Sequence, residues 1–331
     1  MAFSLFSSKN RIINLVISDH SIRLLELKQF NPPLAHRWSE HFLPAGIISD
    51  GKIQNQDSLE SILEECIDEW KIHRRQVRFI IPDSLVIIRK ISVPSEIQDD
   101  EIKGYLYLEL GSTIHLPFDE PVFDFYPLGS NGKTREILLF AAPEQNVMEY
   151  ADLLSKLKLN PIAADISPLA IYRLYRQLDT ELVNENLFAV QFDLTSVNLT
   201  IFERSVPLVM RQFPLPFNMD QWKIKEDSGN NLVYNYIGNT DELDLQFDDI
   251  FREINKLIDF YRYSLHKEHN QISKFLLYGD HPMLNIIYDG MLERFETPTE
   301  MIAIDMDSKG NSVKLPSSQL LPLGLALKGG Q

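Results

Sequence analysis

The sequence has a single cysteine, Cys66, among 331 residues, which excludes an internal disulfide. No apolar run approaches the length needed to cross a bilayer, and the start lacks the core of a signal peptide. Positive charge is also scarce, because 32 lysines and arginines face 47 acidic residues, for a formal net charge of −15. Such a surface repels phosphate backbones, so we expect no nucleic-acid partner. These absences predict a cytoplasmic protein.

Motifs of common catalytic and metal sites are missing too. The chain has no Gly-x-Ser-x-Gly, Cys-x-x-Cys or His-Glu-x-x-His motif. His266 and His269 lie near the end of a predicted helix, and two histidines without a third ligand are typical of a solvated helix end. We therefore predict no metal site. The composition, 44% hydrophobic and 24% charged, is that of a globular chain long enough for two domains.

The chain is organised around residues 12–27, which alternate between apolar and polar positions. Ile13, Leu15 and Ile17 fall on one face of a predicted strand, and a second strand follows the polar turn of residues 18–21. A third extended run covers residues 35–43. The same strand–turn–strand pattern recurs half a chain later, at residues 187–193, 197–202 and 208–213. Two meanders of one design predict an internally duplicated α/β fold.

Helical periodicity appears between and after the meanders. Residues 57–75 form a predicted helix that Asp57 caps with Glu60, and Cys66 lies on its apolar face. Another begins after Ser95 and runs to about Leu110. Residues 218–248 are polar and weakly periodic, with a predicted loop at residues 228–231, and a helix is predicted over 250–265. The remaining predictions are strands at 77–81, 86–93, 137–142, 160–165 and 275–278, and helices at 144–157 and from 167 onwards.

The first meander resembles the opening motif of the PilM family of type IV pilus assembly proteins, relatives of the cell-division protein FtsA. Ser21 and the Glu26-Leu27 pair match that motif, and Arg23 stands where the family has lysine. The family's acidic position is Val16 here, and a family glycine is Ser18. The resemblance implies an actin-like fold, that is, a duplicated ribonuclease-H-like fold.

A longer part of the resemblance covers residues 94–126, where order and spacing persist over some thirty positions. Three shorter matches follow, and together they extend the resemblance over residues 12–327. The matching positions are Glu101, Glu109, Leu116-Pro117-Phe118, Glu120, Asp124 and Tyr126, then Asp165, Leu169 and Ala170, then Asp259-Phe260-Tyr261, and finally Gly324-Leu325-Ala326-Leu327.

In the actin-like fold that the resemblance implies, the meander turns clasp the phosphates of ATP, using glycines and an acidic residue. Here Gln191 falls at the acidic position of the second turn and Asp193 at its glycine. A late Gly-Gly turn is reduced to Gly279-Asp280, and we expect Asp19 to cap its own turn. Side chains at such turns hinder phosphate approach. We therefore predict no catalytic residue and at most weak binding of ATP with magnesium, at Ser18, Asp19, Ser21, Arg23, Asp193, Thr195 and Gly279.

The resemblance also implies the domain plan. The first actin-like domain is expected over residues 1–185, with a small subdomain inserted at about 82–150. The second is expected over 186–331, with a variable subdomain at about 217–270.

PilM-like proteins hold the N-terminal cytoplasmic tail of the single-span inner-membrane protein PilN, and PilN links them to the pilus motor ATPase. The resemblance implies such a scaffold for a type IV or competence pilus, lying at the inner face of the cell membrane, with self-association left open. The implied tail groove is formed by Val86, Ile88, Tyr105 and Glu109. The alternative is that Tyr105, Leu106 and Tyr107 pack the core of the insertion itself. The alternatives are a nucleotide-binding ATPase of the FtsA kind and the cytoplasmic part of a type II secretion L protein.

Overall fold

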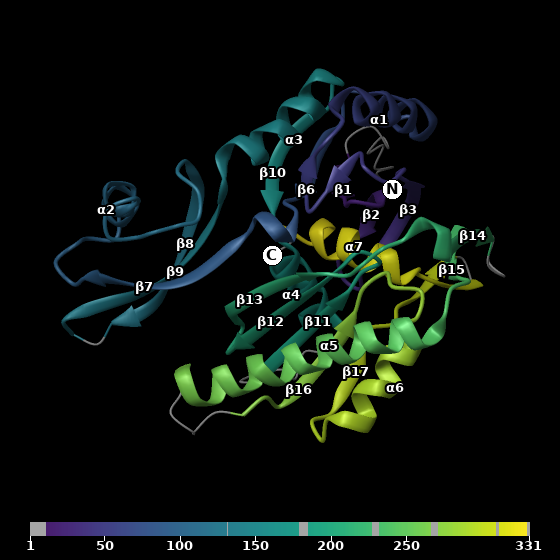
Figure 1. Ribbon diagram of the computed structural model, residues 1–331. Helices are drawn as coiled ribbons and strands as arrows, with labels where there is room; N and C mark the ends of the chain where they lie inside the picture. The colour runs from purple at the N-terminus through teal and green to yellow at the C-terminus, as the bar shows by residue number, and fades with distance from the viewer. Residues whose placement is uncertain are drawn as a thin grey trace, which may run out of the picture.

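A computed structural model describes residues 11–130, 132–178, 185–226, 232–265, 271–308 and 311–329. Figure 1 shows two parts, each built on one β-sheet, and a smaller three-stranded sheet that projects to one side. We call β1 to α4 the first half and β11 to α7 the second half. In the described residues, no helix combines the length and the apolar character needed to span a membrane.

The first half is built on a five-stranded sheet in the order β10-β6-β1-β2-β3. β1 is antiparallel to β2 and parallel to β6, and every residue of β1 is buried. A strand buried on both faces is the centre of its sheet. The strands are β1 (Ile13–Ile17), β2 (Ser21–Gln29), β3 (Leu34–Phe42), β6 (Gln76–Ile80) and β10 (Asn160–Asp165), and a short hairpin of β4 (Ile48–Ser49) and β5 (Lys52–Ile53) follows β3.

The second half repeats this topology in a sheet of order β13-β12-β11-β16-β17. β11 is antiparallel to β12 and parallel to β16, as β1 is to β2 and β6. The predicted duplication is therefore confirmed. The strands are β11 (Asn186–Phe192), β12 (Ser196–Glu203), β13 (Val206–Pro214), β16 (Lys274–Tyr278) and β17 (Thr299–Met301), and β18 (Asp305–Ser308) pairs with β19 (Asn311–Lys314) beyond them.

Two helices of the first half, α1 (Gln56–Trp70) and α3 (Glu144–Lys156), pack on the first sheet. Cys66 is buried there, as predicted. The predicted cap of α1 is wrong: the side chain of Asn55, not Asp57, accepts the backbone N–H of Ser58, and the helix ends at Trp70, with Lys71 in the left-handed conformation. Asn55, two residues before Asp57, accepts a free backbone N–H of the first helical turn, so the predicted cap formed by Asp57 and Glu60 is not needed.

The small sheet lies between β6 and α3 in the sequence and has the order β7-β9-β8. Its strands are β7 (Ile87–Pro94), β8 (Pro121–Ser130) and β9 (Thr134–Pro143), and its helix is α2 (Ile102–Glu109). We call these elements the insertion. The predicted helix start after Ser95 is wrong by about two turns, because residues 95–101 form turns in which Glu101 accepts the N–H of Gln98.

The weakly periodic segment of residues 218–248 contains two strands and the start of a helix, and the loop predicted at residues 228–231 lies outside the described residues. β14 (Trp222–Glu226) pairs with β15 (Leu232–Tyr236), and α5 (Thr240–Asp259) begins behind the cap Asn239. α5 therefore starts ten residues before the predicted helix and continues as a π-helix over Phe260–Leu265. His266 and His269 lie outside the described residues. Acidic residues on the exposed face of α5 concealed its periodicity, although Leu243 and Phe247 are buried.

The last helix of each half packs against the sheet of the other half. α4 (Ser167–Leu178) follows β10, but Ile171 and Leu174 share an apolar cluster with Leu187 and Leu276 of the second sheet. α7 (Leu320–Ala326) ends the second half and contacts β1, β2 and β6 of the first. Figure 1 shows α7 between the two sheets. The helices also touch each other, and a Cβ at Gly324 would lie 2.2 Å from the carbonyl oxygen of Ala170. α6 (Leu284–Arg294) covers the second sheet.

Candidate functional site

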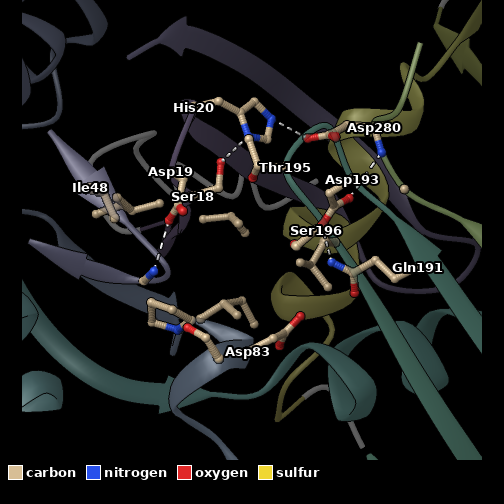
Figure 2. Close-up of a pocket in the computed structure, with 18 of the residues that line it drawn as sticks. Ser18, Asp19, His20, Ile48, Asp83, Gln191, Asp193, Thr195, Ser196 and Asp280 are labelled. Atoms are coloured by element: carbon tan, nitrogen blue, oxygen red, sulfur yellow. Dashed lines mark hydrogen bonds and ion pairs between the residues drawn. The ribbon is translucent and has the colours of Figure 1, made fainter. Parts of the chain in front are cut away.

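The carboxyl ends of the parallel strands of both halves meet at one cavity of about 310 Å³. β1 and β6 reach it from the first half, and β11 and β16 reach it from the second (Figure 2). This edge is where α/β sheets bind ligands. The cavity is lined by residues 16–20, 23, 80–84, 191, 193, 195, 196 and 278–280, by the loop of residues 43–51, and by parts of 212–217 and 317–321.

Two equivalent turns face each other across this cavity. In the first, the N–H of Ser18 donates to the carbonyl of Ser21 over 2.9 Å, and in the second the N–H of Asp193 donates to Ser196 over the same distance. The repeat therefore makes Ser18 equivalent to Asp193. It also makes Val16, two residues earlier, equivalent to Gln191, as the sequence alignment of the two turns predicted.

The turn after β16 sends Asp280 back across the cavity to the first half. Oδ2 of Asp280 lies 2.8 Å from Nε2 of His20 and pairs with the guanidinium of Arg23. Its other oxygen, Oδ1, accepts the backbone N–H of Leu194 over 2.8 Å. The side chains of His20, Arg23 and Asp280 are each about 5% exposed. One carboxylate thus joins the two halves inside the cavity, and Figure 2 shows its contact with His20.

The charges around Asp280 set its ionisation. Burial acts to raise the pKa of Asp280, but Arg23 and His20 outweigh it and hold that pKa well below its usual range. Burial likewise acts to lower the pKa of Arg23, and the charges of Asp280 and Glu40 raise it above its usual value. Nε of Arg23 donates to Glu40 over 2.7 Å. The pair is therefore a charged one, with both partners hydrogen-bonded.

Asp193 lies beside this pair in a different environment. Its Oδ1 accepts the N–H of Asp280 over 3.2 Å, and its Oδ2 accepts the side-chain amide of Gln191, whose own oxygen accepts the hydroxyl of Tyr278 over 3.0 Å. Burial, with the negative charge of Asp280, raises the pKa of Asp193 to about 7. Asp193 therefore changes charge near neutral pH.

Asp19 does not cap its own turn, so that expectation was wrong. Its carboxylate accepts two N–H groups of the β4–β5 turn, from Asp50 over 2.7 Å and from Gly51 over 3.0 Å. A long-range contact of this kind cannot be seen in the local sequence. It fixes the loop that forms one wall of the cavity.

Asp83, after β6, forms another link between the halves. Oγ of Ser167 donates to it over 2.5 Å, and the amide of Asn198 on β12 lies 3.3 Å from that hydroxyl. Burial raises the pKa of Asp83 to about 6, although the hydrogen bond from Ser167 opposes the shift. Asp83 and Asp280 lie on opposite sides of the cavity in Figure 2.

The model of the family described as type IV pilus assembly protein PilM matches residues 15–214, more than half of the chain. The chain belongs to the PilM family. A solved PilM–PilN type IV pilus biogenesis complex contains a chain with the same fold, with a TM-score of 0.77 at 20% identity over 98% of this chain and 99% of that one. The predicted α/β actin-like fold is thus confirmed.

More distant likenesses lie among other proteins. EutJ of Carboxydothermus hydrogenoformans is 11% identical over 96% of this chain and 89% of its own, with a TM-score of 0.49. MreB5 of Spiroplasma citri, bound to ADP, is 9% identical over 96% and 95%, with a TM-score of 0.47. A search of curated proteins found no match.

The cavity residues do not fit ATP with magnesium, the ligand that the actin-like fold implies. Arg23 is the one arginine or lysine among the described residues that line the cavity, and Asp280 and Glu40 already hold it. The other charged side chains in the lining include the carboxylates of Asp19 and Asp83. A triphosphate placed here would meet negative charge with no free cation. In the described residues, no cluster of three or more metal-binding side chains occurs.

The predicted nucleotide residues are largely brought together. Ser18, Asp19, Arg23, Asp193, Thr195 and Gly279 line the cavity. Ser21 lies just behind, buried, with its Oγ 3.1 Å from that of Ser18. Sequence reasoning gave no role to His20 or Asp280. The signal in the sequence was an acidic residue, Asp280, in place of a family glycine, together with arginine, Arg23, in place of the family lysine, because the structure pairs these two side chains.

The predicted groove residues lie in two places on the insertion. Val86 and Ile88 are half-buried where the chain enters β7, next to the main body, and β7 contacts β13 there. Tyr105 is half-buried and packs on the core of the insertion, where Leu106 is fully buried. Oε2 of Glu109 pairs with the hydroxyl of Thr113. The groove that these four residues were predicted to form therefore stays a prediction.

Proposed function

We propose that this chain is a cytoplasmic scaffold of a type IV pilus or competence-pilus machine, located at the inner face of the cell membrane. It holds the N-terminal tail of a PilN-like single-span membrane protein and through it meets the motor ATPase indirectly. The observation that supports this most is the likeness to the chain in the PilM–PilN complex, which covers 98% of this protein and so includes the insertion.

The insertion offers the chemistry that an extended tail needs. β7 is an outer strand of the β7-β9-β8 sheet, so a peptide can add main-chain hydrogen bonds along it. Ile88 is half-buried on this strand, and the exposed Arg89 and Lys90 follow it. An apolar anchor beside Ile88 and an acidic group beside Arg89 would complement this edge, whereas Lys90 already pairs with Glu136 over 3.6 Å. We place the tail here, between β7 and the main body, with Tyr105 and Glu109 at the far limit of the groove.

The test is a calorimetric titration with a peptide of the first residues of the PilN-like protein encoded in the same genome. Ile88→Arg should weaken binding at least about tenfold, which is about 1.4 kcal/mol. Leu245→Arg is the matched control, because Leu245 is 66% exposed on α5, far from the insertion in sequence. Failure of the folded wild-type protein to bind the peptide would contradict the proposed function.

A second pair of variants tests whether the groove extends as far as α2. Tyr105→Ala with Glu109→Lys is compared with Tyr107→Ala plus Glu293→Lys, since Tyr107 is 73% exposed on the same helix and Glu293 is exposed on α6. Loss in the first pair alone would place α2 in the groove. Equal binding by both, with loss in Ile88→Arg, would confine the groove to β7.

A further inference from the structure

Three donors from the two halves converge on one carboxylate inside the cavity. Arg23 comes from β2 and His20 from the turn before it, both in the first half. The N–H of Leu194 comes from the equivalent turn of the second half. A guanidinium, an imidazole and a backbone N–H at a turn form an anion-binding site. Here the anion is the side chain of Asp280.

Asp280 is held in this position by the backbone before it. Gly279 has φ +132°, a conformation that side chains rarely adopt, and a Cβ there would lie 1.9 Å from the carbonyl oxygen of Phe192. The N–H of Asp280 is bound by Asp193 over 3.2 Å. The backbone that carries the Asp280 carboxylate is therefore held in one conformation by its contacts with Phe192 and Asp193.

Among the described residues that line the cavity, no carboxylate other than Asp280 forms an ion pair. Asp19 is bound by two backbone N–H groups and Asp83 by a serine hydroxyl, so the other acidic groups near the strand ends face neutral donors. In the described lining, the guanidinium of Arg23 is the single lysine or arginine cation, and it is taken by Asp280 and Glu40. A free phosphate must displace Asp280 to reach it.

We propose that Asp280 is a built-in anion, which fills the anion-binding position between the two turns and fastens the halves together without a nucleotide. The cleft of this chain is thereby kept closed by an ion pair within the protein, and phosphate-bearing ligands are excluded from it. This inference does not depend on the pilus partner.

Removing the built-in anion should expose the site beneath it. Inorganic pyrophosphate is titrated into Asp280→Ala and into wild type in a calorimeter. We expect the variant to bind pyrophosphate at least about tenfold more tightly than wild type does. The double variant Arg23→Ala, Asp280→Ala should lose this gain. Asp289→Ala, an exposed site that makes the same change in net charge, should show none.

A second measurement tests whether Asp280 holds the two halves together. Hydrogen exchange of the segments 15–22 and 190–197 should quicken in Asp280→Ala and stay unchanged in Asp289→Ala. Should Asp280→Ala fail to fold, Asp280→Asn keeps the oxygen that accepts the N–H of Leu194, removes the charge, and puts an NH2 donor where Oδ2 accepted from Arg23 and His20. Pyrophosphate binding by the wild type as tight as by these variants, or unchanged binding and exchange in a folded Asp280 variant, would overturn the proposal.

Discussion

Gly279 lies against the main chain of Phe192 so closely that no side chain fits between them. A Cβ at position 279 would stand 1.9 Å from the carbonyl oxygen of Phe192 and 2.9 Å from its nitrogen. The glycine that the sequence suggested as a remnant of a nucleotide turn therefore has a structural role of its own: it lets β16 and β11 end side by side.

Gly279→Ala should consequently lower the free energy of unfolding, by on the order of 3 kcal/mol, because it adds both a clash and an unfavourable φ. Chemical denaturation measures the change. Gly104→Ala is the control, since a Cβ added at that position on α2 would meet no atom of another part of the chain within 4 Å, and alanine in a helix is expected to be neutral or slightly stabilising. Equal stability of the two variants would contradict the packing argument.

Much of the fold follows from the sequence because the meanders are local. β1, β2, β11 and β12 were predicted within one or two residues of their ends, since their buried runs are bounded by polar turns. The starts of α2 and α5 were missed for opposite reasons. Ser95 resembles a cap but is followed by turns, and the charged outer face of α5 masks its first ten residues.

The purified protein should release no phosphate from ATP above background. Val16 stands where the fold places an acidic residue, and Asp280 takes the single lysine or arginine in the described lining of the cavity. A coupled phosphate-release assay with magnesium checks this. Turnover that depends on magnesium and disappears when Asp193 is replaced would contradict it.

Restoring the first turn alone should not restore the site. Val16→Asp with Ser18→Gly is expected to show almost no thermal shift with ATP, because Asp280 and the second turn still occupy the cavity. Adding Asp280→Ala to this double variant is the informative comparison. A clear shift in the double variant by itself would show that the first turn alone had excluded nucleotide.

Asp193 should make stability depend on pH. Its pKa is raised by burial and by Asp280, from about 3.9 in an unfolded chain to about 7 in the folded protein. Between these values the native state holds one more proton than the unfolded state, so the stability that this carboxyl supports is lost as pH rises toward 7. Asp280, with its lowered pKa, acts oppositely and loses its contribution only in acid.

Asp193→Asn should therefore stabilise the protein by about 1–2 kcal/mol near pH 8 and much less near pH 4.5. The amide of Gln191 must turn over to accept from the new Asn side chain, and the hydroxyl of Tyr278 can then accept in turn. Melting temperatures at the two values of pH measure the effect. Asp289→Asn, at an exposed site, controls for charge. A pH-independent difference would exclude Asp193 as its source.

The site was less predictable than the fold, because its decisive contacts span the chain. His20 and Asp280 are 260 positions apart, and nothing near either residue in the sequence indicates the other. The resemblance assigned Ser18 and Asp193 to the same position of the two turns, and the hydrogen bonds of these turns show that the two residues are equivalent. The contacts of Asp280 with His20 and Arg23 became visible only when the two halves were brought together.

The packing of α4 and α7 against the sheet of the opposite half has a consequence for folding during synthesis. Val16 and Ile80, which belong to the first third of the chain, share a buried cluster with Leu325, near its end. During synthesis, part of the first sheet stays exposed to solvent until α7 has left the ribosome and can pack against it. A chain terminated before Leu320 should then be recognised by chaperones and degraded as a whole, because its amino-terminal half cannot complete its core alone.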